Sequence, residues 1–337
     1  MAPSDLSIPA SPPQSNVPLA RELAYLSLPI VLVTILFAPA LFGDRQLVFR
    51  DAGHFYYPYF QLQVDQWRQG RIPLWNPHEN GGEPLAGNPT ASLFYPGKLI
   101  FALLPYPTAY KLYLVGHVWW AALTMYLAAR RHGLDAPSAS LASLTYAGSG
   151  FVLFQVYNIV FLVGAAWLPF GMYLVHRLIE SPTLRLAVGL ALVLAMQILG
   201  GDPQVAQMTL VLAIPFLLFR HLPFRQAFLL CLGFAGLGLG MTSFASPIRE
   251  ILDTFRNSPS WGDELSTVWL KGEAISAASI ARLALAIAGV LVLLVGLVRW
   301  CGRDARQSLL TLAFAAILSI GMAAIQILPT LEFTSLS

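Results

Sequence analysis

Apolar residues gather in nine runs along the chain, and each run is close to the length of a membrane-crossing helix. About 20 mostly apolar residues suffice to cross a bilayer as a helix. Backbone polar groups in lipid must be hydrogen-bonded within their own segment, so the runs are predicted to be helices. The pattern predicts an all-α, polytopic transmembrane bundle of about nine helices. Their expected bounds are 24–43, 108–130, 137–156, 159–179, 183–200, 203–221, 225–245, 277–298 and 308–329.

Arginines occur in every second connection between these runs, and this asymmetry predicts an orientation. Cytoplasmic loops of membrane proteins are enriched in Lys and Arg. The turns around Tyr157 and Asp202 carry neither residue type. The N-terminus is therefore predicted to be cytoplasmic, and residues 44–107, both turns and residues 246–276 are predicted to lie outside. The arginines of the cytoplasmic connections are Arg130, Arg131, Arg177, Arg185, Arg220, Arg225, Arg299, Arg303 and Arg306.

Composition narrows the class of protein. The chain is 56% hydrophobic and 11% charged, whereas soluble domains carry about 25% charged residues. An ordinary soluble enzyme and a disordered protein are thus excluded. The net charge of +3 is small and the arginines are scattered, so no nucleic-acid partner is expected. Residues 1–22, which begin with a Pro- and Ser-rich stretch, are predicted to be a disordered cytoplasmic leader.

The segment between the first two apolar runs, residues 44–107, is long, aromatic and rich in Pro, Gly and Asn. Loops of this length are usually functional or disordered, and the Tyr and Trp content argues against disorder. Within it, residues 91–105 are too short and too interrupted to cross a bilayer. They are predicted to form an interfacial or re-entrant helix, with Lys98 extending its amine to the lipid headgroups.

Short motifs follow the first apolar run in a fixed order: Asp51 with Tyr56-Tyr57-Pro58, Gly70-x-x-Pro73-Leu74-Trp75-Asn76-Pro77, Gly81-Gly82-x-Pro84-Leu85, Asn88-Pro89 and Phe94-Tyr95-Pro96. As a set they resemble the bacterial YfhO-type membrane proteins, which are similar in architecture to the GT-C glycosyltransferases. Residues 200–204 and 327–332 resemble later family motifs, with Asp202 where the family often has His before Pro-Gln. Residues 23–337 are therefore expected to form a GT-C-like transmembrane domain.

Chain length departs from this family. Its members are usually much longer and have more membrane helices. This chain stops at Ser337, just after an apolar run, which is typical of a fragment or a truncated product.

The resemblance implies transfer of a sugar on the outer face of the bacterial cytoplasmic membrane, by a multi-pass protein. The donor would be a polyprenyl-phosphate-linked sugar carried in the membrane lipid, and the acceptor a cell-surface polymer, lipid or protein. In GT-C enzymes an acidic residue of the first external loop lies at the catalytic centre, and Asp51 matches that position. A loop aspartate is also a common turn or cap residue, so both roles stay open for Asp51.

Asp202 is the second catalytic candidate, because ionisable residues near membrane depth are often functional. Its position before Pro203 equally suits a helix N-cap. Aromatic candidates for stacking on a sugar could instead belong to an interfacial aromatic belt. The leaving phosphate needs positive charge, either from an arginine or from a divalent metal ion, which is the one candidate cofactor; the sequence does not decide between them. The candidates for substrate binding are His54, Tyr56, Tyr57, Trp75, Asn76, Asn88, Tyr95, Gln204, Arg249 and Arg256, and Arg50 is the cation nearest Asp51 in sequence.

Two other functions compete with sugar transfer. One is a transporter or flippase of a lipid-linked saccharide that performs no chemistry, and the other is a non-catalytic membrane scaffold. Transporters more often have charged or broken helices at the membrane midplane. The nearly charge-free apolar runs and the long aromatic loop favour the transferase.

Overall fold

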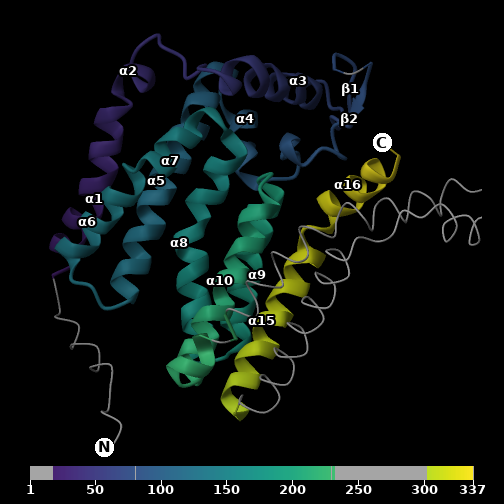
Figure 1. The fold of residues 1–337 in the computed structure, drawn as a ribbon. Helices are drawn as coiled ribbons and strands as arrows, with labels where there is room; N and C mark the ends of the chain where they lie inside the picture. Colours follow the sequence, from purple (N-terminus) through teal and green to yellow (C-terminus); the bar gives the residue numbers. More distant parts are fainter. Residues whose placement is uncertain (1–17, 80, 229, 232–301, 337) are drawn as a thin grey trace, which may run out of the picture. The chain divides into compact units, whose positions relative to one another are not determined.

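Helices make up most of the computed structural model, which describes residues 18–79, 81–228, 230–231 and 302–336 (Figure 1). β-structure in this part of the chain is confined to one two-stranded antiparallel hairpin, in which Trp75 lies opposite Pro84 and Asn76 opposite Glu83. The elements are α1 Leu19–Leu36, α2 Ala38–Leu41, η1 Ala52–Tyr56, α3 Tyr57–Arg68, β1 Trp75–Asn76, β2 Glu83–Pro84, η2 Pro89–Ala91, η3 Pro96–Leu99, α4 Ile100–Leu103, α5 Tyr106–Arg131, α6 Ala136–Ala147, α7 Gly150–Leu153, η4 Phe154–Tyr157, α8 Ile159–Glu180, α9 Leu184–Leu199, α10 Pro203–His221, α15 Arg303–Met322 and α16 Ala324–Leu336.

The chain divides into two compact units. Unit 1 comprises residues 1–213 and 310–337, and unit 2 comprises residues 214–309. The described part of unit 2 has a small apolar core of Leu218, Leu222, Ala227 and Leu230. Every candidate residue that the structure describes belongs to unit 1.

Five of the nine expected spans are long, apolar helices: α1, α5, α8, α10 and α15. These helices indicate a multi-pass membrane protein. The expected span 137–156 is instead a helix pair, α6 followed by residues 150–157, bent by 43°. The expected span 183–200 is α9, whose 16 residues extend about 24 Å. The expected spans 225–245 and 277–298 lie largely or wholly outside the described residues, so nine spans stay a prediction.

The core of unit 1 is built on α5, which packs against α1, α6 and α8. Alanines line these contacts, and small residues let helix backbones approach closely. The hydroxyls of Thr124 and Ser143 use this closeness, because they donate to the carbonyls of Ala166 and Ala122 at 2.8 and 2.6 Å. These two hydroxyls thus link α5 to α8 and to α6.

The two ends of unit 1 differ in character. At one end, which we call the arginine end, Arg130 binds Glu22 with Nε and Oε1 2.6 Å apart, and the rings of His132 and His176 stack at 4.7 Å. The start of α1 therefore lies beside the end of α5, and the end of α5 lies beside the end of α8. The opposite end, which we call the loop end, holds residues 42–106 and the turns that precede α8 and α10. The connections expected to be cytoplasmic and those expected to be external thus lie at opposite ends of unit 1, in agreement with the arginine pattern. Which end faces the cytoplasm stays a prediction.

The first loop contains more helical structure than the sequence indicated. It contains a 12-residue helix, α3, which begins at Tyr57 with Pro58 in its first turn. Proline suits this position because the backbone N–H that it lacks would be unpaired there. The expected helix 91–105 is divided among the end of η2, η3 and the single turn of α4.

Lys98 does not extend to headgroups, and that expectation is wrong. Its side chain is 2% exposed. Its amine donates to Gln63 Oε1 at 2.8 Å and to the carbonyl of Ala91, and it lies 3.5 Å from the centre of the Phe60 ring. Two acceptors and an aromatic face replace the water that the amine loses. Burial lowers the pKa of Lys98.

Candidate functional site

Three segments far apart in sequence meet at the loop end. The Tyr56 hydroxyl donates to Asn158 Oδ1 at 2.8 Å, which links the start of α3 to the turn before α8. The Ser92 hydroxyl donates to the Gly200 carbonyl at 2.8 Å, which links the first loop to the turn before α10. The motif residues of the first loop and the turns at 157 and 201 therefore form one folded surface.

Asp51 is exposed and comes directly before η1. Its carboxylate forms no hydrogen bond or ion pair with the residues that the structure describes. Its neighbour Arg50 has a left-handed backbone, with φ of 50°, and its guanidinium carbon lies 5.3 Å from the centre of the Tyr157 ring. A non-glycine residue in this region is uncommon and often marks a functional site. The result is a free carboxylate next in sequence to a guanidinium that is held on the turn before α8.

Asp202 is buried, with 1% of its surface exposed. Its Oδ1 accepts the N–H of Val205 at 3.0 Å, so it caps α10 as one of the two readings predicted. Its Oδ2 is buried against Gly164 and has no hydrogen-bond partner within the described part of the chain. Burial raises the pKa of Asp202, and the hydrogen bonds from Val205 and Gln204 act in the opposite direction.

The charges of both candidate carboxylates act on Tyr56. Its pKa is raised, first by burial, then by the charge of Asp51 and to a smaller extent by that of Asp202. Both carboxylates are therefore close enough to act on the same phenol. They differ in access, because Asp51 faces solvent whereas Asp202 is enclosed. Of these two carboxylates, only that of Asp51 is exposed in this conformation.

A second group of candidates surrounds the β-hairpin. Trp75 is about half exposed, whereas Asn76 is buried and donates to Glu79 Oε2 at 3.0 Å. Asn88 caps η2 through the N–H of Thr90 and also approaches Glu83. Glu83 Oε1 accepts the Tyr59 hydroxyl at 2.9 Å, which ties the hairpin to α3. Asn76 and Asn88 therefore stabilise loop structure, and Trp75 is the accessible member of this group.

The other candidates are dispersed. Tyr95 is buried, with its hydroxyl 2.9 Å from His117 Nε2 and 3.1 Å from Trp167 Nε1, and burial raises its pKa to about 12. Its ring faces are packed in the core in this conformation. His54 and Gln204 are exposed. Arg249 and Arg256 lie outside the described residues.

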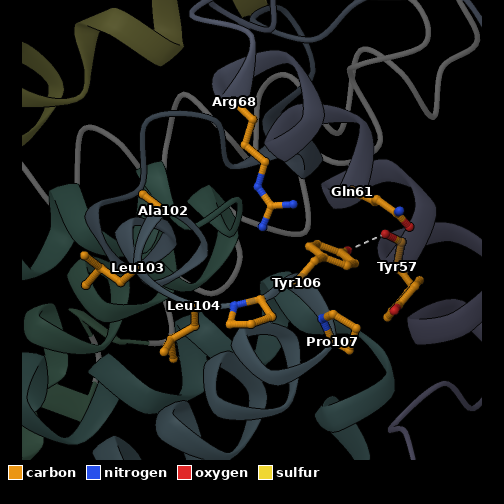
Figure 2. A pocket seen from close by; sticks show the side chains of 9 residues that line it. Tyr57, Gln61, Arg68, Ala102, Leu103, Leu104, Tyr106 and Pro107 are labelled. Atoms are coloured by element: carbon orange, nitrogen blue, oxygen red, sulfur yellow. Dashed lines mark hydrogen bonds between the residues drawn. The ribbon is translucent and has the colours of Figure 1, made fainter.

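Tyr57 lines a hollow of about 540 Å³ beside α3 (Figure 2). Gln61 and Arg68 line it from the same helix, and residues 102–107 form the opposite wall. Sequence reasoning missed Gln61 and Arg68. The spacing of 57, 61 and 68 places them on one helical face, and this signal becomes readable only once α3 is known to be a helix.

Metal ligands are not gathered in the described part of the chain, where no three His, Cys, Asp or Glu side chains are placed to share an ion. No protein-family model, curated protein or solved structure matches this chain.

Proposed function

We propose that the protein transfers a sugar from a polyprenyl-phosphate donor to a cell-surface acceptor, at the loop end of unit 1. The observation that carries the proposal is the exposed carboxylate of Asp51, which is unpaired among the described residues and follows Arg50, whose guanidinium lies over the Tyr157 ring. The motif resemblance of the first loop also supports it. The rings of Phe42, Phe49 and Phe154 are exposed in the same region, as suits a site beside lipid.

The chemistry assigns one role to each charged residue. The acceptor hydroxyl attacks the anomeric carbon, and its oxygen forms the new bond while Asp51 takes the proton as general base. The bond between the anomeric carbon and the phosphate oxygen breaks, and its electron pair leaves with the polyprenyl phosphate. Arg50 stabilises the negative charge on that phosphate. Attack opposite to the leaving group inverts the anomeric centre.

Asp202 has a supporting role in this proposal. Its capping bond fixes the start of α10, and its closeness to Tyr56 helps to set the position of η1 behind Asp51. We call it a positioning residue, because its carboxylate is enclosed.

The test uses membranes that contain the full chain, supplied with labelled polyprenyl-phosphate glucose or mannose. Asp51→Asn should lower the rate of sugar transfer by about 10²–10⁴-fold, the usual effect of removing a general base. Asp44→Asn is the matched control, since Asp44 is an exposed carboxylate of the same loop. Arg50→Gln should also lower transfer, whereas Arg45→Gln should not.

Three results would count against the proposal. Near-normal transfer by Asp51→Asn at normal expression would make Asp51 a turn residue. Movement of the labelled lipid across the bilayer without transfer would favour a flippase. Absence of both activities in the wild type, with either sugar, would favour a scaffold.

A further inference from the structure

The hollow beside α3 combines one cation with an apolar rim. Arg68 is the last residue of α3, and Figure 2 shows its side chain pointing toward Tyr106. It forms no ion pair within the part of the chain that the structure describes, and neither does the nearby Asp65. The charge of Arg68 is therefore available to a ligand.

The opposite wall of the hollow borders the most exposed leucines of the loop end. Leu103 is 79% exposed and Leu99 is 69% exposed, one helical turn apart on η3 and α4. Large apolar side chains this exposed at the edge of a membrane domain are suited to lipid chains. A cation and an apolar strip thus lie side by side.

The aromatic walls are not open for stacking on a sugar ring. Tyr106 is buried, its hydroxyl donates to the Tyr57 carbonyl, and its ring stacks on Phe101 with centres 5.6 Å apart. Tyr57 packs edge-on against Tyr106 and Tyr110. The groups left to bind a ligand are the Arg68 guanidinium and the Gln61 amide.

We propose that this hollow binds the phosphate of a membrane phospholipid, with an acyl chain along Leu99 and Leu103. The planar guanidinium fits a phosphate, which is the main anion at headgroup level in a bilayer. The Gln61 amide supplies a second donor. This lipid site is distinct from Asp51 and holds whether or not the protein transfers sugar.

The experiment measures lipid binding to the purified full chain in detergent, by native mass spectrometry. Phosphatidylglycerol, diacylglycerol and inorganic phosphate are titrated separately. We expect phosphatidylglycerol to bind, and Arg68→Gln to weaken the tightest binding step roughly tenfold or more, as expected for loss of a charge-assisted hydrogen bond. Arg71→Gln, which removes an exposed arginine three residues away, should leave binding unchanged.

Two further variants separate charge from packing. Arg68→Lys should retain most of the affinity, and Leu103→Gln should weaken phosphatidylglycerol binding without changing the weak response to inorganic phosphate. Equal lipid binding by wild type and Arg68→Gln would overturn the proposal. Diacylglycerol binding as tightly as phosphatidylglycerol, or an equal loss in Arg71→Gln, would also overturn it. If Arg68→Gln does not fold, the Leu103→Gln result decides.

Discussion

The turn at Gly201 attaches the first loop to the helices, and one added methyl group should loosen it. Gly201 has φ of +95°, and a Cβ there would lie 2.6 Å from Val160 Cγ1, 2.7 Å from Ser92 Oγ and 2.9 Å from the Pro89 carbonyl oxygen. A side chain in the left-handed region costs about 1 kcal/mol. Crowding in a packed site costs about 1–3 kcal/mol more. Gly201→Ala should therefore lower the free energy of unfolding by about 2–4 kcal/mol.

Two other glycines separate these contributions. Gly70 has φ of +71° with nothing within 4 Å of a built Cβ, so Gly70→Ala should lose only the backbone part, about 1 kcal/mol. Gly116 lies within α5 and also has open space, so Gly116→Ala should stabilise the protein by about 0.5–1 kcal/mol.

Thermal unfolding in detergent, followed by loss of helical circular dichroism at one heating rate, compares the three variants. At roughly 2–4 °C per kcal/mol, Gly201→Ala should unfold about 4–16 °C below the wild type and Gly70→Ala about 2–4 °C below it. If the two variants unfold at the same temperature, Ser92 and Pro89 do not pack against this turn. A rise in the unfolding temperature of Gly201→Ala would refute both the left-handed backbone and the close approach.

Two more predictions concern Asp202 and the orientation of the chain. Because the folded-state pKa of Asp202 is raised, the stability that its protonated form contributes is complete below the unfolded pKa of about 4 and is lost as pH rises through the folded pKa. Asp202→Asn keeps the cap without this titration, so its unfolding temperature should rise relative to that of the wild type as pH increases from about 4 through the folded-state pKa. Parallel curves would contradict the raised pKa. For orientation, cysteines at the exposed positions Gln69 and Asp135, in a background where Cys231 and Cys301 are serine, should react oppositely with an impermeant thiol reagent in intact cells. Gln69 should be labelled and Asp135 protected, and the reverse result would invert the topology.

The long apolar runs made the main helices predictable, because a bilayer imposes both length and helical structure on them. Asp202 was predictable as a cap for a local reason, namely its place before a proline that begins a helix. The broken span at residues 147–150 was not predicted, although Gly148 and Gly150 flank the Ser149 cap. The apolar content of a segment does not by itself predict such a bend.

The first loop was less predictable, because its structure depends on distant partners. α3 mixes apolar and polar residues, so it has no long apolar run to mark it. Lys98 has the sequence context of a headgroup anchor, and only Gln63 and Phe60 of the folded α3 explain its burial. The hollow beside Arg68 needs both α3 and the corner before α5, which no local pattern brings together.

The contacts that hold the first loop impose an order on its biosynthesis. Ser92 is 108 residues from Gly200, and Ala86 is 240 residues from Gln326 of α16, whose amide donates to its carbonyl at 2.8 Å. At about 5–20 residues per second, the ribosome supplies these partners about 5–22 s and about 12–48 s after the loop itself. Through that interval the loop lacks the groups that fix it in the folded structure. The segment that carries Asp51 is thus among the first parts of the chain to be made and among the last to be completed.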